Sequence, residues 1–241
     1  MKAKLVTLCF CVVFTTLRSF AAPFQNLGFE DANTSAAVFV GQDLMASPAD
    51  LVPGWQVFRD GISLDLVGYN QGSVPFFENS PGGPLIFDSN YEFRVGVDGP
   101  DPIEGRFTFR IHETGRGPSL APSFSIVQRG DIPIDARFLY YTYRHRPFEV
   151  TVNGVILTPP SQNSLSRPTT VALDISSFAG QNVELRFRAT HPFLPEFGPH
   201  DLDSIAFVIP EASTVVLFSF GLLALTARFW RRRNRPLGLN G

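Results

Sequence analysis

Residues 22–211 contain no stretch that keeps a helical repeat of apolar residues, and this restricts the possible folds of the chain more than any other feature. Short alternating or β-branched runs are instead separated by Gly, Pro, Asn and Asp, the residues that favour turns. We predict a helical turn at 175–179 and strands at residues 37–40, 55–58, 62–67, 91–97, 106–113, 123–128, 136–144, 148–152, 155–157, 169–173, 183–189 and 204–208. Many short strands with frequent turns are typical of a β-sandwich or jelly roll.

Two of these runs allow more detailed predictions. Asn153-Gly154 separates the runs 148–152 and 155–157 and predicts a tight hairpin, because both central residues of such a turn need positive φ. Apolar and polar side chains alternate along residues 106–112, which predicts one buried face and one face in water. The polar positions of that run are Arg106, Thr108, Arg110 and His112.

The formal net charge of −2 conceals three segments of different charge. Residues 1–21 carry +3, residues 212–241 carry +5, and residues 22–211 carry −10 because they contain 12 arginines and 22 acidic residues. The acidic middle segment lacks the basic face of a nucleic-acid-binding domain, so we expect no nucleic-acid partner. The chain has only two cysteines, Cys9 and Cys11, which excludes a disulfide-rich scaffold.

Residues 1–21 have the organisation of a secretory signal peptide. Lys2 and Lys4 form a positive start, residues 5–17 are a run of apolar residues and threonines, and Ser19 and Ala21 are small residues before the cleavage point. We predict cleavage by signal peptidase after Ala21; the alternative is a retained anchor or a buried first helix. Cleavage would leave the mature chain without cysteine.

The C-terminal segment combines a short apolar run with a cluster of arginines. Residues 215–227 carry no charge, and at ~1.5 Å per residue they are shorter than a ~30 Å hydrocarbon core. Interfacial Trp230 and the arginines extend the usable length. We predict one transmembrane helix with a cytoplasmic C-terminus, the alternative being an amphipathic or buried terminal helix. The arginines that stop it are Arg228, Arg231, Arg232 and Arg233.

The order Pro210, Glu211, Ala212, Ser213, Thr214, then the apolar run and the arginine-rich tip, resembles the PEP-CTERM sorting signal of Gram-negative bacteria. Ala212 departs from the second proline of that motif. The resemblance implies export, an inner-membrane-anchored precursor with its domain in the periplasm, and processing by an exosortase on the way to the cell surface or the extracellular space. It divides the chain into a signal peptide (1–21), a β-sandwich domain (22–208), a sorting signal (209–235) and a tail (236–241).

Three stretches of the middle segment resemble jelly-roll domains of the carbohydrate-binding-module type. The opening one is Asn-Leu-Gly-Phe-Glu at 26–30 followed by Pro-Gly-Trp at 53–55, and the closing strand is Asp-Leu-Asp-Ser-Ile at 201–205. Between them, Asp-Ile-Ser at 174–176, Ala-Gly-Gln at 179–181 and Leu-Arg-Phe at 185–187 resemble a late strand pair. The resemblance implies an all-β, jelly-roll-like sandwich. It also implies a structural calcium where the first and last strands meet, at positions matched by Glu30 and Asp203.

Two carboxylates are few for calcium, which takes six to eight oxygen ligands. The alternative is that Glu30 and Asp203 are ordinary hydrogen-bonded acids at strand ends. A second acidic group, Asp98 and Asp101 with Glu104, lies among Gly and Pro residues, and we interpret it as a turn.

Residues 138–145 form the run richest in aromatic side chains. In an extended strand Tyr141 and Tyr143 share one face, while Tyr140 lies on the other. Rings with polar tips can stack on sugars, so Tyr141 and Tyr143 are our candidates for binding polysaccharide, although such rings equally fill sandwich cores. We interpret Trp55 as a core anchor.

No catalytic motif is found, and the chain has no lysine after Lys4. We expect an exported, non-catalytic protein of the cell surface or extracellular matrix. The alternatives are a carbohydrate-binding module that engages exopolysaccharide and a glycan-active hydrolase, which would need two carboxylates that meet in space.

Overall fold

The computed structural model describes residues 22–41, 43–70, 83–90, 92–94, 97–98, 101–111, 123–157, 164–189 and 199–209. The predicted signal peptide and the predicted sorting signal from Pro210 onward lie outside these residues. Among the described residues, no helix has the length and apolar character needed to cross a membrane.

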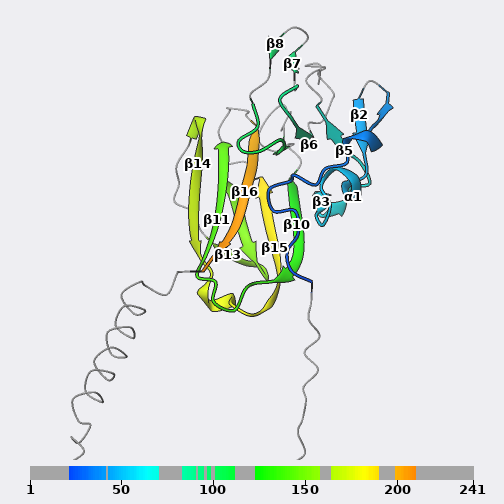
Figure 1. Ribbon diagram of the computed structural model, residues 1–241. Helices are drawn as coiled ribbons and strands as arrows, with labels where there is room; N and C mark the ends of the chain where they lie inside the picture. The colour runs from blue at the N-terminus through cyan, green and yellow to red at the C-terminus, as the bar shows by residue number, and fades with distance from the viewer. Residues whose placement is uncertain are drawn as a thin grey trace, which may run out of the picture.

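The described residues form a β-sandwich of two large sheets (Figure 1). The first, eight-stranded sheet has the order β1 (Val38–Val40), β2 (Asp43–Ala46), β5 (Val67–Tyr69), β6 (Pro84–Phe87), β9 (Thr108–Ile111), β16 (His200–Val208), β11 (Phe138–His145) and β14 (Ser164–Asp174). The second, six-stranded sheet has the order β13 (Val155–Leu157), β12 (Phe148–Val152), β15 (Asn182–Ala189), β10 (Phe124–Asp131), β3 (Gln56–Arg59) and β4 (Ile62–Ser63). Neighbouring strands are antiparallel except for the parallel pair β5 and β6.

The smaller elements lie outside these sheets. They are the strand pair β7 (Glu92–Arg94) and β8 (Val97–Asp98), the short helix α1 (Pro48–Leu51), and the 3-10 turns η1 (Thr34–Ala36) and η2 (Ser176–Phe178). Helix α1 begins at Pro48 because Ser47 caps it, its hydroxyl accepting from the Asp50 N–H at 3.2 Å.

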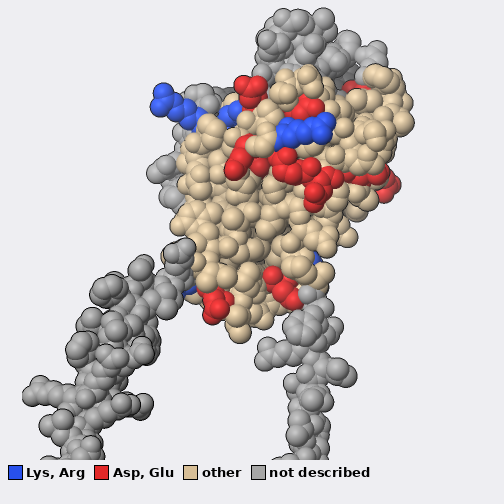
Figure 2. Space-filling model, viewed as in Figure 1, with Lys and Arg blue, Asp and Glu red and all other residues tan. Residues whose placement is uncertain are grey.

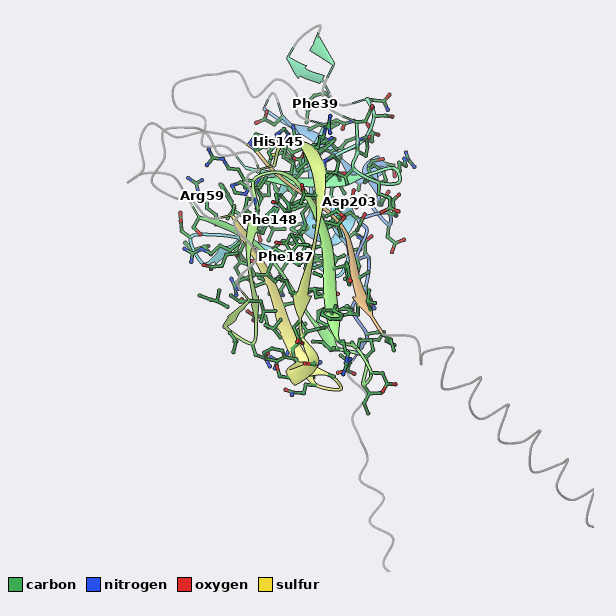
Figure 3. All side chains as sticks on the ribbon, turned by 90° about the vertical axis from the view of Figure 1, so that its left-hand side faces the viewer. Phe39, Arg59, His145, Phe148, Phe187 and Asp203 are labelled. Carbon is green, nitrogen blue, oxygen red and sulfur yellow. The ribbon has the colours of Figure 1, made fainter. Side chains whose placement is uncertain are left out.

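Aromatic rings from both sheets meet in the core. The Tyr141 ring of β11 lies 5.3 Å from the Phe187 ring of β15 in an edge-on contact, and Phe148 of β12 lies 6.2 Å from Phe187 (Figure 3). Trp55 is 3% exposed, and its indole N–H donates to the Asn26 carbonyl at 3.1 Å. The prediction that Trp55 is a core anchor is confirmed.

Two of the turn predictions are confirmed, whereas Asp98, which we predicted in a turn with Asp101 and Glu104, lies in strand β8. Asn153 and Gly154 have φ of 49° and 78°, and they join β12 to β13 with Val152 opposite Val155. Element η2 is the predicted helical turn before Gly180.

Several strand limits differ from prediction. The run 62–67 divides into β4 and β5, which belong to different sheets. The run 91–97 divides into β7 and the start of β8, which pair antiparallel with each other. Strand β16 begins at His200, four residues before the predicted start of the strand at 204. β2, β6 and α1 were not predicted, because runs of four residues show too little periodicity.

The two described ends of the chain lie together at one end of the sandwich, the lower end in Figure 1. The Phe24 ring packs 5.0 Å from the Phe207 ring of β16, and the Ile205 N–H donates to the Leu27 carbonyl at 3.2 Å. In Figure 2 charged side chains gather mainly across the upper part of the visible face, away from these ends.

Candidate functional site

A group of polar side chains lies on the outer face of the eight-stranded sheet, where β9, β16 and β11 run side by side. Phe109, Ile111 and Leu202 belong to the core between the sheets. Because side chains alternate along a strand, Arg110 and Asp201 point to the opposite, outer face.

The outer face is buried here, which corrects the prediction of a face in water along residues 106–112. Thr108 is 0% exposed and Arg110 is 1% exposed. The alternation of apolar and polar side chains identifies the two faces of β9. It does not show whether other residues cover the polar face. Arg106 lies outside β9 and is exposed as predicted, and His112 lies outside the described residues.

Asp201 lies between two arginines on the neighbouring strands. Its cross-strand partners are Arg110 on β9 and Arg144 on β11. Arg110 donates from Nε to Oδ1 at 2.6 Å and from Nη2 to Oδ2 at 2.8 Å, and Arg144 donates from Nε to Oδ2 at 2.8 Å. The three side chains form a buried ionic cluster that ties three adjacent strands together.

The surroundings of this cluster keep Asp201 ionised. Burial alone would raise the pKa of Asp201, but the charge and hydrogen bonds of Arg110, followed by the charge of Arg144, hold it below the ordinary value. The Arg110 guanidinium also lies over the Phe87 ring, 4.7 Å from its centroid. A carboxylate engaged in this way is suited to holding strands in register and poorly suited to accepting a proton from a substrate.

His145 closes the cluster at the end of β11. Its Nε2 lies 3.7 Å from Asp201 Oδ2, and its side chain is 27% exposed. A register irregularity between Tyr143 and His145 and a φ of 73° at His145 mark the point where β11 departs from regular pairing. His200 instead lies at an edge-on angle to Phe148, with ring centroids 5.3 Å apart, so His200 and Asp201 lie on opposite faces of β16.

The two predicted calcium ligands approach the same loop, residues 101–107. Both Glu30 carboxylate oxygens accept from the Arg106 N–H at 3.0 Å. Asp203 Oδ2 accepts from the Thr108 hydroxyl at 2.6 Å and from the Glu104 N–H at 3.2 Å. Glu104 in turn accepts from the Ser204 hydroxyl. Glu30 and Asp203 therefore both contact the loop that contains Glu104, and Asp203 is 1% exposed.

The pKa of Asp203 is shifted upward. Burial raises its pKa to about 7, against the opposing effect of its hydrogen bonds, and the negative charge of Glu30 adds to the rise. Asp201 and Asp203 are thus two residues apart on one strand with opposite pKa shifts. The arginines beside Asp201 account for the difference.

As described, these carboxylates do not fit a calcium site. Both Glu30 oxygens and Asp203 Oδ2 face N–H or O–H donors, whereas calcium needs oxygen ligands directed at one point. Within the described part of the chain, no three His, Cys, Asp or Glu side chains converge closely enough to hold a metal ion. Calcium therefore stays a prediction from the sequence.

The predicted sugar-binding tyrosines are corrected by their burial. Tyr141 and Tyr143 are both 0% exposed and belong to the core, so neither ring offers a face to a polysaccharide. The alternative, that these rings fill the core, is confirmed. The outward side of β11 carries half-buried Phe138 and Tyr140, whose rings meet edge-on at 6.2 Å.

Sequence reasoning did not identify Arg110 and Arg144 as functional residues. Their partner Asp201 lies 91 and 57 residues away in the chain, and neither arginine belongs to a recognisable motif. The signal that could have identified them is that each is an arginine within a predominantly apolar strand.

No protein-family model matches this chain, and no curated protein matches it. Among solved structures, a cyclase from Fischerella sp. TAU is similar with a TM-score of 0.43 and 15% identity, covering 77% of this chain and 94% of that chain. The K1 cleaved adhesin domain of Lys-gingipain from Porphyromonas gingivalis W83 has a TM-score of 0.35 and 10% identity, covering 68% and 96%. The enzymatically active domain of bacteriophage CBA120 tailspike protein 4 also has a TM-score of 0.35 and 10% identity, covering 67% of this chain and 20% of that one. We draw no functional conclusion from similarities of this size.

Proposed function

We propose that this chain is an exported, non-catalytic protein whose β-sandwich is delivered to the cell surface or extracellular matrix by an exosortase-type sorting signal. The observation that carries the proposal is the ordered C-terminal segment of Pro210-Glu211, an uncharged run at 215–227 and an arginine cluster. A signal-peptide-like segment at 1–21 complements it. In the described part, the two chain ends leave the sandwich at one end, so both segments can be removed without disturbing the core.

The test follows the full chain through a host that encodes an exosortase. We expect a mature N-terminus at Ala22, a membrane-bound precursor, and a shorter product from cleavage near Pro210. Replacing Arg231, Arg232 and Arg233 together by Gln should cause loss of membrane retention, of processing, or of both. A chain found in the cytoplasm with Cys9 and Cys11 retained would contradict the proposal.

The non-catalytic part of the proposal is supported by the state of two buried acids on β16. Asp201 is engaged by two guanidinium groups, and Asp203 is buried with its oxygens accepting hydrogen bonds. A glycan hydrolase would need two carboxyl groups facing across a substrate site. Turnover of any member of a glycan panel by the exported protein would overturn this part.

Polysaccharide binding is the second candidate, on a face different from the one first predicted. A jelly-roll-like arrangement with half-buried Phe138 and Tyr140 on the outer side of β11 would offer two adjoining rings to a sugar. We expect Tyr140→Ala to weaken retention on exopolysaccharide, while Thr142→Ala on the same face serves as control. Equal retention of both variants and the parent would exclude this face.

A further inference from the structure

Strand β1 is the most exposed apolar element among the described residues, and it ends the eight-stranded sheet. Val38, Phe39 and Val40 are 61%, 76% and 44% exposed. On its inner side β1 pairs with β2 in full register, with Phe39 opposite Leu44. Within the described residues, no strand pairs with its outer edge.

An end strand with these properties is open to pairing. Its outer edge presents backbone N–H and C=O groups in a row, and another extended strand satisfies such a row best. Proteins usually protect such edges with Lys, Pro, inward-pointing charges or bulges. Residues 32–41 contain no Lys, Arg, Asp, Glu or Pro, and the pairing of β1 with β2 shows no bulge. Strand β1 therefore lacks these protective features.

The sequence of β1 favours a second copy of itself as the partner. Val-Phe-Val reads the same in both directions. When two such strands pair antiparallel about Phe39, Phe39 lies opposite its counterpart and Val38 lies opposite Val40 of the other copy. Apolar side chains then meet on both faces, in the self-complementary arrangement that a twofold interface requires.

Charge opposes the approach of a second copy least at β1. Residues 22–211 carry −10, so two copies repel each other over most of their surfaces. The stretch 32–41 is uncharged, so copies that approach there bring few charged side chains together, the nearest along the sheet being Asp43 opposite Val40 on β2. Phe39 also lies well away from the end of the sandwich where the chain ends leave, so pairing there leaves both ends accessible (Figures 1 and 3).

From these observations we infer that the protein forms a homodimer by antiparallel pairing of β1 with β1 of a second copy, which continues the eight-stranded sheet across the twofold axis. The contact is small, so the dimer is weak in dilute solution and is favoured where copies are concentrated on a surface. Repulsion between the acidic domains opposes the dimer. Because added salt screens this repulsion, it strengthens the dimer. This inference goes beyond the proposed function and does not depend on it.

Cysteine cross-linking of the full chain tests the register directly. In the paired strands the two copies of residue 39 have Cα atoms about 4.5–5.5 Å apart, within the range for a disulfide. We expect Phe39→Cys to give a disulfide-linked dimer under mild oxidation, and Val38→Cys to cross-link best when co-expressed with Val40→Cys. The parent chain controls for Cys9 and Cys11.

Ile156→Cys is the matched control. Ile156 is 58% exposed on β13, a three-residue strand that ends the other sheet. Cross-linking of Phe39→Cys but not of Ile156→Cys supports the inference, whereas equal cross-linking of both, or none at Phe39→Cys, overturns it. As a second measurement, sedimentation of the detergent-solubilised full chain should show a dimer that grows with concentration and salt. Phe39→Lys should abolish that dimer while leaving the circular dichroism spectrum unchanged, and a parent chain that stays monomeric throughout would overturn the inference.

Discussion

Arg110 and Asp201 lie directly opposite each other on β9 and β16, and two N–H groups of the guanidinium donate to the two carboxylate oxygens at 2.6 and 2.8 Å. Arg144 reaches the same carboxylate from the other neighbouring strand. Removing the Asp201 carboxylate leaves two buried guanidinium groups without their shared counter-ion. This lowers the free energy of unfolding more than the loss of an exposed ion pair does.

We therefore expect Asp201→Asn to lower the free energy of unfolding by about 3–5 kcal/mol in urea titrations. Glu149→Gln is the matched control, because Glu149 pairs with Arg188 at 3.7 Å where both side chains are partly exposed, and it should cost less than about 1 kcal/mol. Equal costs for the two variants would show that the ionic cluster does not tie the sheet together.

The raised pKa of Asp203 predicts a pH-dependent stability. Its folded pKa of about 7 exceeds the ordinary 3.8, so its contribution is complete below pH 3.8 and is lost as pH rises to about 7. The full loss corresponds to roughly 4 kcal/mol. Asp203→Asn should remove this slope, and the difference between variant and parent isolates it from histidine titration.

The same titration tests the calcium prediction. A bound cation would favour the ionised carboxylate and lower the pKa of Asp203. From the described hydrogen bonds we expect the same midpoint with calcium as with a chelator. A midpoint that falls, together with a melting temperature that rises, on adding calcium would instead support the site inferred from Glu30 and Asp203.

The Tyr141 hydroxyl provides a test of core polarity. It is buried and has no hydrogen-bond partner among the residues that the structure describes, and burial raises the pKa of Tyr141. Because removing such a hydroxyl removes a desolvation penalty, Tyr141→Phe should leave stability within about 0.5 kcal/mol of the parent or increase it. Tyr69→Phe is the control: the Tyr69 hydroxyl donates to Asp88 at 2.7 Å, and its removal should cost about 1–3 kcal/mol in the same unfolding assay.

Gly105 and Gly61 separate backbone strain from side-chain crowding. Both have positive φ, 61° and 81°. A Cβ at Gly105 would collide with the Glu30 carboxylate, whereas a Cβ at Gly61 has no atom of the described residues within 4 Å beyond its chain neighbours. We expect both Ala variants to lose about 1 kcal/mol from strain and Gly105→Ala to lose more. In a Glu30→Ala background the two losses should become equal, and a persisting difference would contradict the role given to Glu30.

Much of the β-sandwich could be predicted from local sequence, because alternation and turn chemistry are local properties. Asn153-Gly154 needs only its own two residues to specify a hairpin, and the limits of β12 and β13 agree with prediction. The strand from His200 could not be predicted in full, since its polar start is stabilised by Arg110 and Arg144 on strands distant in the chain.

The candidate site was predicted only in part for the same reason. Glu30 and Asp203 were found through a resemblance, and they do reach one loop. The burial of Tyr141 and Tyr143 depends on Phe187 and other residues of the opposite sheet, which no property of β11 reveals. Which face of an aromatic strand is covered is decided by its neighbours in space.

The contact between Phe24 and Phe207 determines how the domain would be oriented relative to an attachment point. Both ends of the described chain lie at the same end of the sandwich. Attachment through either terminal segment would therefore hold the domain in the same orientation. At ~3.3 Å per residue the eleven residues of β14 span roughly 35 Å, which sets the height of the far pole above an attachment point. Under the proposed attachment the domain would act as a spacer, and the β1 edge and the charged upper region would face away from the attachment point with either terminal segment as the tether.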